Sequence, residues 1–167
     1  MDVNKETEAT PAENRTKLER TSEREVVVTR TVNGPVRLVF EAWTKAELFR
    51  RWWVPKSYGL TLLSCEMDVR VGGQYRLVFL HEGSQMEFFG TYVEVTPNAR
   101  LVWTNEEGDR GTTVTTVTFE EIAGKTLVVV HDLYPSKEAV DTGSAGAMPE
   151  TFDQLDELLA SLGAGTE

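Results

Sequence analysis

Apolar and polar residues alternate along most of the chain between residues 60 and 132. The alternation begins with Leu63, Cys65, Met67 and Val69, which single polar residues separate. A period of two is typical of a half-buried β-strand. Turn residues separate six such segments, so the pattern predicts a six-stranded antiparallel meander. An earlier β-branched run, Glu25–Val32, predicts a further strand that joins the edge of this sheet.

Helical spacing of apolar residues appears on both sides of the meander. A helix is predicted after Pro35, followed by a second short helix that ends near Trp52 and has Thr44 as its expected cap. The last helix has the strongest pattern, an apolar stripe at spacings of three and four formed by Met148, Phe152, Leu155, Leu159 and Leu162. This stripe predicts a helix of about 16 residues with one buried face.

The resulting order of elements is β-α-α-β6-α, which predicts an α+β domain. A long half-buried meander must cover one of its faces, and the last helix is the only element long enough to do so. The sequence therefore predicts a curved antiparallel sheet that grips a long C-terminal helix. The space between sheet and helix is either packed core or a cavity.

The ends of the domain are marked by composition. Val3 and Leu18 are the only large aliphatic residues among the first 22. Such a segment cannot bury enough apolar surface to offset its ordering, so residues 1–22 are expected to form a disordered tail. The domain then spans residues 23–163, because Gly163 ends the last helix, and residues 164–167 form a C-terminal tail.

Composition excludes several classes of protein. The 167 residues are 40% apolar and 26% charged, as in globular domains. No apolar run is long enough for a membrane-spanning helix, and the first residues lack a signal-peptide core, so a cytoplasmic location is expected. The single cysteine, Cys65, excludes an intramolecular disulfide, and with only two histidines it cannot complete a four-ligand zinc site. No metal site and no cofactor is expected.

Charge is distributed unevenly along the chain. The net charge is −10, and residues 82–167 carry 16 acidic but only 4 basic groups. Such a chain repels the backbone of nucleic acids, so no nucleic-acid partner is expected. One local basic cluster, formed by Arg50, Arg51 and Lys56 around two tryptophans, is either a contact for an anion or a protein partner, or a solvated helix end.

The aromatic residues supply candidates for a ligand-binding wall. Apolar walls with few polar groups are typical of ligand pockets, and equally of packed cores. The candidate wall consists of Trp53, Tyr75, Phe79, Phe89, Trp103, Phe119, Met148, Phe152 and Leu155.

Two polar residues are candidates for the interior. In residues 126–132, alternation places His131 on the same face as Leu127 and Val129, which is taken as the core face. In residues 86–95, taking Glu94 as solvent-facing turns inward Val93, Thr91, Phe89 and Glu87; a bulge would reverse this assignment. If both assignments hold, Glu87 and His131 line the cavity as an acid–base pair or as ligand contacts. In the alternative, His131 bonds to backbone at the sheet rim and Glu87 meets solvent.

Several longer motifs occur in a fixed order along the chain. They are Pro35 with residues 39–44 (VFEAWT), Leu48 with residues 51–55 (RWWVP), the pattern ExDxRxGGxYR over residues 66–76, residues 90–97 (GTYVEVTP), residues 100–103 (RLVW), and GxTxV over residues 124–128. In this combination the chain resembles the activator of heat-shock-protein-90 ATPase homologue branch of the START-like superfamily, over about residues 24 to 162. The resemblance implies a helix-grip fold. The Gly-Trp pair of many relatives is missing near Gly146, which affects the expected shape of the pocket.

Three functions follow from these features. The first is binding of a small hydrophobic or aromatic ligand between the curved sheet and the C-terminal helix. The second is an enzyme of the polyketide cyclase or aromatase type, with the same cavity and an acid–base pair. The third is a co-chaperone that activates a heat-shock-protein-90-type ATPase through surface contacts. The first is favoured, and no membrane insertion is expected.

Overall fold

The computed structural model describes residues 16–106, 111–141 and 147–165. Its strands are β1 (Lys17–Arg20), β2 (Glu25–Val32), β3 (Thr61–Met67), β4 (Gln74–His81), β5 (Ser84–Thr96), β6 (Arg100–Asn105), β7 (Thr113–Ile122) and β8 (Lys125–Leu133). Its helices are α2 (Val36–Thr44), α3 (Ala46–Trp52), the 3₁₀ turn η2 (Lys56–Tyr58), α4 (Lys137–Asp141) and α5 (Met148–Gly165). The predicted order of elements is confirmed, with β1 and α4 added to it.

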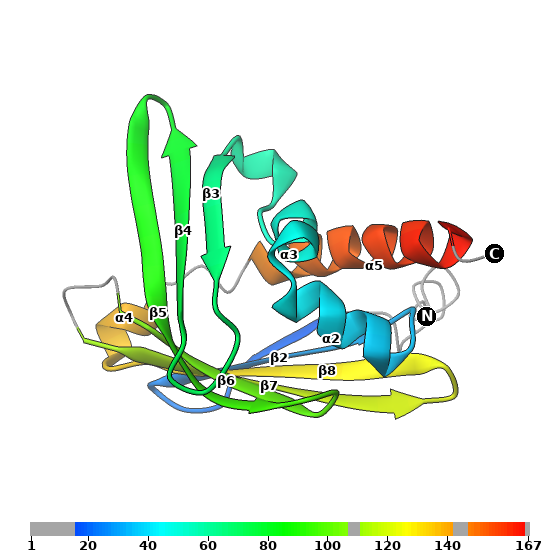
Figure 1. Ribbon diagram of the computed structural model, residues 1–167. Helices are drawn as coiled ribbons and strands as arrows, with labels where there is room; N and C mark the ends of the chain where they lie inside the picture. Colours follow the sequence, from blue (N-terminus) through cyan, green and yellow to red (C-terminus); the bar gives the residue numbers. More distant parts are fainter. Residues whose placement is uncertain (1–15, 107–110, 142–146, 166–167) are drawn as a thin grey trace, which may run out of the picture.

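The eight strands form one antiparallel sheet in the order β1-β2-β8-β7-β6-β5-β4-β3. The predicted meander is therefore confirmed, and β2 joins its far edge beside β8. Figure 1 shows β3, β4 and the first half of β5 rising steeply from the remaining strands. The sheet is thus bent into two arms, and β5, with 13 residues, belongs to both.

Gly90 lies in the middle of β5, opposite Tyr75 of β4. A Cβ atom at this position would lie only 1.8 Å from the carbonyl oxygen of Thr104 and 2.9 Å from the Tyr75 ring. The close approach of β6 and of the tyrosine ring therefore requires a residue without a side chain. This glycine allows β5 to pass from one arm of the sheet to the other.

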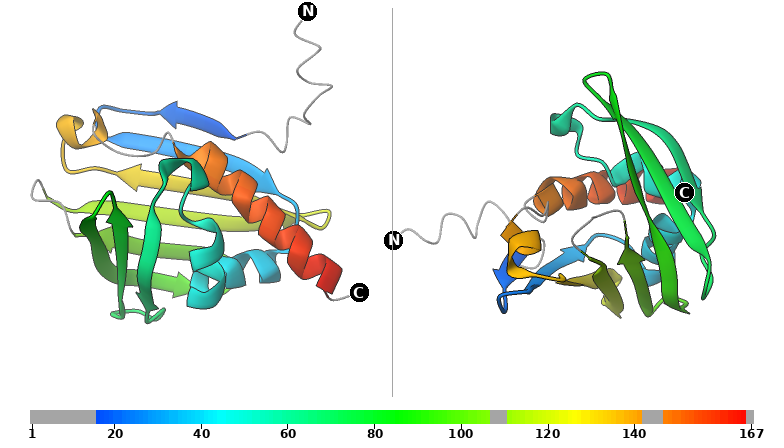
Figure 2. Two further views of the ribbon diagram at one scale, coloured as in Figure 1. Left: turned by 90° about the horizontal axis from the view of Figure 1, so that it is seen from above. Right: turned by 90° about the vertical axis from the view of Figure 1, so that its left-hand side faces the viewer.

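Helices α2, α3 and α5 lie in the angle between the two arms and cover the inner face of the sheet (Figures 1 and 2). The predicted apolar stripe of α5 faces this core: Phe152 and Leu155 are fully buried and Leu159 is 2% exposed. Met148 and Leu162, at the two ends of the stripe, are half-buried. The sheet therefore grips α5 as the sequence predicts.

Polar contacts fasten α5 at two places. Arg30 of β2 is 7% exposed, and its guanidinium contacts Asp156 Oδ2 at 2.6 Å and Asp153 Oδ1 at 2.9 Å. On the other side, Gln154 Nε2 donates to the carbonyl oxygens of Trp52 and Val54 at 2.9 and 2.8 Å. These contacts fix the helix axis relative to β2 and to the end of α3.

Three boundary features differ from the predictions. Helix α5 does not end at Gly163 but continues to Gly165, so residues 164 and 165 belong to the helix and not to a tail. Residues 17–20, placed in the disordered tail, form strand β1, whose side chains are all exposed. Its backbone pairs with the open edge of β2, so main-chain hydrogen bonds order it without apolar burial. Thr44 does not cap α3; its hydroxyl donates to the carbonyl oxygen of Phe40 at 2.8 Å, within its own helix. The predicted tails over residues 1–15 and 166–167 lie outside the described residues.

The inner faces of β5 and β8 also differ from the predictions. The register of β5 against β6 shifts between Tyr92 and Glu94, so Tyr92 is buried while Val93 is 52% exposed. This bulge is the feature that reverses the predicted orientation of the residues before it. In β8 the buried residues are Thr126, Val128 and Val130, so the inward orientation predicted for Leu127, Val129 and His131 was wrong.

Candidate functional site

Four polar side chains form a continuous row across the inner face of the sheet, one from each of β4, β6, β7 and β8. Hydrogen bonds connect Tyr75 Oη to Asn105 Oδ1 at 2.9 Å, Asn105 Nδ2 to Thr115 Oγ1 at 2.9 Å, and Thr115 Oγ1 to Asp132 Oδ1 at 2.6 Å. These residues, Tyr75, Asn105, Thr115 and Asp132, are called the polar row below. Their inward orientation follows from the strand pairing, because Thr115 lies opposite both Trp103 and Asp132.

The carboxyl group at the end of the polar row has an unusual environment. Burial raises the pKa of Asp132 above its ordinary value, although the hydrogen bond from Thr115 acts in the opposite direction. The neighbouring Tyr134 is 9% exposed, and burial together with the charge of Asp132 raises its pKa to about 12. A carboxyl group with so little access to water interacts strongly with any polar group placed next to it.

The polar row lies on the inner face beyond the first turn of the long helix α5. Figure 2 shows α5 beginning part-way along the strands, so the C-terminal end of β8 and the N-terminal end of β7 extend past its first turn. Asn105 and Asp132 are accordingly half-buried, whereas Val117 and Val128, further along the same strands, are fully buried.

Apolar side chains adjoin the polar row on the same face. The ring centroid of Tyr92 lies 5.8 Å from that of Tyr75 and 6.5 Å from that of Trp103. Met67 pairs with Tyr75 across β3 and β4 and is half-buried. The row is thus bordered by an aromatic and thioether surface, the combination that commonly orients a small apolar molecule by one polar end.

The residues that the sequence predicts for the site, the apolar wall together with the two polar candidates, divide into three groups. Six are buried in the core on the inner side of the sheet: Tyr75, Phe79, Trp103, Phe119, Phe152 and Leu155. Two are half-buried at the edge of that core: Trp53 and Met148. Three lie on the outer face of the sheet: Glu87, Phe89 and His131. Of the first group, Tyr75 belongs to the polar row and Trp103 adjoins it.

The structure overturns the predicted acid–base pair. Glu87 lies on the outer face and forms an ion pair with Arg76 of β4. His131, on the outer face of β8, has its Nε2 2.9 Å from Glu25 Oε2, and the bonds to Ser22 and His131 lower the pKa of this glutamate. The two residues therefore have separate partners and do not line an inner cavity together.

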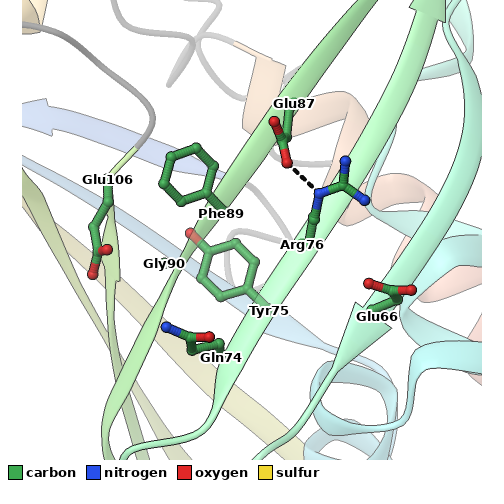
Figure 3. Close-up of a pocket in the computed structure, with 8 residues that line it drawn as sticks. All are labelled: Glu66, Gln74, Tyr75, Arg76, Glu87, Phe89, Gly90 and Glu106. Atoms are coloured by element: carbon green, nitrogen blue, oxygen red, sulfur yellow. Dashed lines mark hydrogen bonds and ion pairs between the residues drawn. The ribbon is translucent and has the colours of Figure 1, made fainter.

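The outer face carries a depression of its own. A cavity of about 420 Å³ is lined by Glu66, Gln74, Tyr75, Arg76, Glu87, Phe89, Gly90 and Glu106. Figure 3 shows the Arg76–Glu87 pair at one end, Glu106 on the opposite side and Phe89 between them. Half of the lining residues are charged, and the ion pair is about half exposed, so the cavity differs in kind from the apolar surface inside the sheet.

Metal and thiol chemistry receive no support from the described part of the chain. Within residues 16–106, 111–141 and 147–165, no group of three or more histidine, cysteine, aspartate or glutamate side chains could hold a metal ion. Cys65 is half-buried on the inner face, and burial raises the pKa of its thiol. A thiol held in its protonated form is a poor nucleophile.

Sequence reasoning missed three members of the polar row: Asn105, Thr115 and Asp132. One signal was available, since Asp132 follows the apolar run 127–130 two positions after Val130. A carboxylate in step with the buried positions of such a strand is uncommon unless it has partners. Using this signal required knowing which of the two apolar faces of β8 is the inner one.

The chain was compared with families and structures of known proteins. A model of the family described as "Activator of Hsp90 ATPase homolog 1-like protein" matches residues 33–160. No curated protein sequence matches the chain. No helix of the described residues is long and apolar enough to cross a membrane.

Several solved bacterial structures share the fold over nearly their whole length. A Rhodobacter sphaeroides protein is 24% identical, with a TM-score of 0.79, 88% of this chain covered and 99% of that one. A Nitrosomonas europaea protein is 24% identical, with a TM-score of 0.73 and coverages of 86% and 98%. An Arthrobacter aurescens protein is 18% identical, with a TM-score of 0.76 and coverages of 87% and 91%. These similarities concern the fold alone.

Proposed function

Because the chain belongs to the Activator of Hsp90 ATPase homolog 1-like family, the branch of the START-like superfamily that its motifs indicate, we propose that it binds a small hydrophobic or aromatic molecule between the curved sheet and α5. The ligand lies against the inner face beyond the first turn of α5. There Trp103 and Tyr92 supply aromatic surface, and Met148 at the start of α5 supplies the opposite side.

One observation carries this proposal: a hydrogen-bonded polar row that ends on a carboxyl group runs across the inner face beside a predominantly apolar core. A domain that needed only a packed core gains nothing from a carboxyl group there, because desolvating it costs free energy. Ligand-binding sites commonly contain such groups despite the cost of desolvating them, because a few well-placed polar groups orient an apolar ligand. The half-buried state of Asp132 and Asn105 supports access for a guest molecule.

The proposal is tested first without choosing a ligand. Native mass spectrometry of freshly purified protein should reveal a co-purifying small molecule. NMR titration with a panel of lipids, flavonoids and polyketides should then shift the signals of Trp103, Asn105 and Met148. Shifts confined to the outer face around Phe89 and Glu106 would contradict the proposal.

Two variants test the location of the binding site without depending on which ligands the panel contains. Met148→Trp enlarges a half-buried residue at the start of α5 and should weaken binding by filling the space beside it. Val93→Trp makes a comparable enlargement on the outer face, at a residue that is 52% exposed, and should leave binding unchanged. Equal effects of the two variants would argue against an inner site.

A further inference from the structure

We propose that the inner site selects ligands whose polar end is a hydrogen-bond donor, a hydroxyl or amino group, and excludes carboxylates. This inference rests on the proposed function and specifies its ligand class. It excludes fatty acids and favours apolar alcohols, phenols and amines. The argument depends on the direction in which the hydrogen bonds of the polar row are donated.

Every donor of the polar row is already used. The single hydroxyl hydrogen of Tyr75 is shared between the Thr104 carbonyl and Asn105 Oδ1, at 2.8 and 2.9 Å. The amide group of Asn105 has two hydrogens, and Nδ2 lies 2.9 Å from Thr115 Oγ1 and 3.4 Å from the Thr113 carbonyl. The Thr115 hydroxyl donates to Asp132 Oδ1 at 2.6 Å. Donation therefore runs in one direction, from Tyr75 to Asp132.

The row ends on the Asp132 carboxyl, which can only accept once it is ionised, at a pH above its raised folded-state pKa. An ionised carboxylate offers about four acceptor positions on its two oxygens. The hydrogen bond recorded for Asp132 within the described residues occupies Oδ1 alone. At this end the polar row itself therefore offers a ligand spare acceptors and no spare donor hydrogen. A hydroxyl or amino group can complete the row, whereas a carboxylate or ether oxygen cannot.

Electrostatic repulsion also disfavours ligands that carry a carboxylate. A ligand carboxylate would place a second negative charge next to Asp132, and like charges in a poorly solvated site disfavour each other strongly. The imidazole of the adjacent residue, His131, points to the opposite face and contacts Glu25 there. A ligand beside this end of the polar row therefore meets the carboxyl of Asp132.

A matched series of three aromatic probes tests the inference by calorimetric titration: 2-naphthol, 2-methoxynaphthalene and 2-naphthoate. The three probes share the naphthalene ring system. Only 2-naphthol can donate a hydrogen bond, whereas the other two offer acceptors alone. We expect 2-naphthol to bind about tenfold more tightly than 2-methoxynaphthalene, the size of one hydrogen bond to a charged acceptor. We expect 2-naphthoate to bind most weakly. A second series of 1-decanol, decyl methyl ether and decanoate repeats the comparison on an aliphatic scaffold.

Variants assign the selectivity to Asp132. Asp132→Asn keeps the shape and removes the charge, so the preference for 2-naphthol over 2-naphthoate should fall by about tenfold or more. Glu25→Gln removes a negative charge from the outer face of the neighbouring strand and should keep the preference intact. Thr115→Val removes the donor but keeps the Asp132 charge, so carboxylates should stay excluded. If Asp132→Asn does not fold, the probe series on the wild-type protein still tests whether donors are preferred over carboxylates.

The possible outcomes distinguish failure of the donor selectivity from failure of the proposed ligand binding. Tighter binding of 2-naphthoate than of 2-naphthol to the wild-type protein would overturn the donor selectivity and leave ligand binding in place. Equal selectivity in the wild-type and Asp132→Asn proteins would overturn the assignment to this carboxyl. Failure of all six probes to bind would overturn the proposed function, and the inference with it.

Discussion

The two ends of the inner face of the sheet are built from the same strands but differ in what covers them. At the packed end, beneath α2, α3 and α5, side chains such as Val28, Val117 and Phe152 have no exposed surface. At the polar end, defined by the polar row, Asn105 and Asp132 keep part of their surface. The comparison indicates that the packed end supplies most of the stability, and it agrees with the proposal that the polar end binds a ligand, because activity and stability commonly compete for the same residues.

The largest expected effect lies at the packed end. Phe152 of α5 is fully buried and contacts Trp43, with ring centroids 6.5 Å apart. Replacing it with alanine should lower the free energy of unfolding by about 3–5 kcal/mol, since the lost burial and the remaining cavity both destabilise. Chemical denaturation measures the change. Phe89→Ala on the outer face, where the side chain is 36% exposed, serves as the control and should cost markedly less.

The second prediction concerns the attachment of α5 to β2. Asp153 and Asp156 both pair with Arg30, but their side chains are 67% and 16% exposed, and Asp156 also accepts the Asn33 backbone amide at 2.8 Å. Asp156→Ala should therefore cost about 2–3 kcal/mol, because it leaves the buried guanidinium with less compensation. Asp153→Ala should cost less than about 1 kcal/mol, as exposed pairs do. Equal losses in denaturation would show that burial does not control the strength of this attachment.

The packed end could be predicted from the sequence because its signals are local. The apolar stripe of α5 repeats within one helix, and Phe152 and Leu155 face the core as expected. The turn residues of the meander likewise fix the number and order of its strands. No knowledge of distant contacts was needed for either conclusion.

The polar end could not be predicted because it depends on register. Residues 127–130 of β8 are apolar on both faces, so alternation alone does not decide which face is buried. Pairing of Val128 with Phe119 decides it, and this pairing joins two strands across the sheet. In β5 the extra residue at Val93 reverses the face of Glu87 and Phe89. A pattern with period two carries no information about where such a bulge occurs.

The third prediction tests the hydrogen bonds of the polar row. Tyr75→Phe removes the hydroxyl bonded to the Thr104 carbonyl and Asn105 Oδ1 and leaves the ring in place. Because a single hydrogen bond contributes little net stability, the loss in the free energy of unfolding should be about 1 kcal/mol. Thermal unfolding measures it. A loss as large as that of Phe152→Ala would mean that the polar end stabilises the fold as strongly as the packed end, against the comparison made above.

The smallest expected effect is a change in how stability depends on pH. Burial raises the pKa of Asp132 in the folded state above the ordinary value of 3.8. The folded protein therefore holds this proton to a higher pH than the unfolded chain does. The resulting contribution to stability is fully present below the ordinary pKa and is lost as the pH rises through the folded pKa. Relative to Asp132→Asn, the wild-type protein should lose stability as the pH rises from 3.8 through the higher pKa of the folded state.

Taking the difference between the two proteins isolates this carboxyl. Glu25, Asp141 and Glu150 have lowered pKa values, so their contributions are lost as the pH falls, which is the opposite sign. Both proteins contain these three groups, and they cancel in the difference. Denaturation curves at several pH values therefore report Asp132 alone. A difference that stayed constant with pH would show a well-hydrated carboxylate, and the polar end would then be ordinary surface and not a desolvated site kept open for a guest.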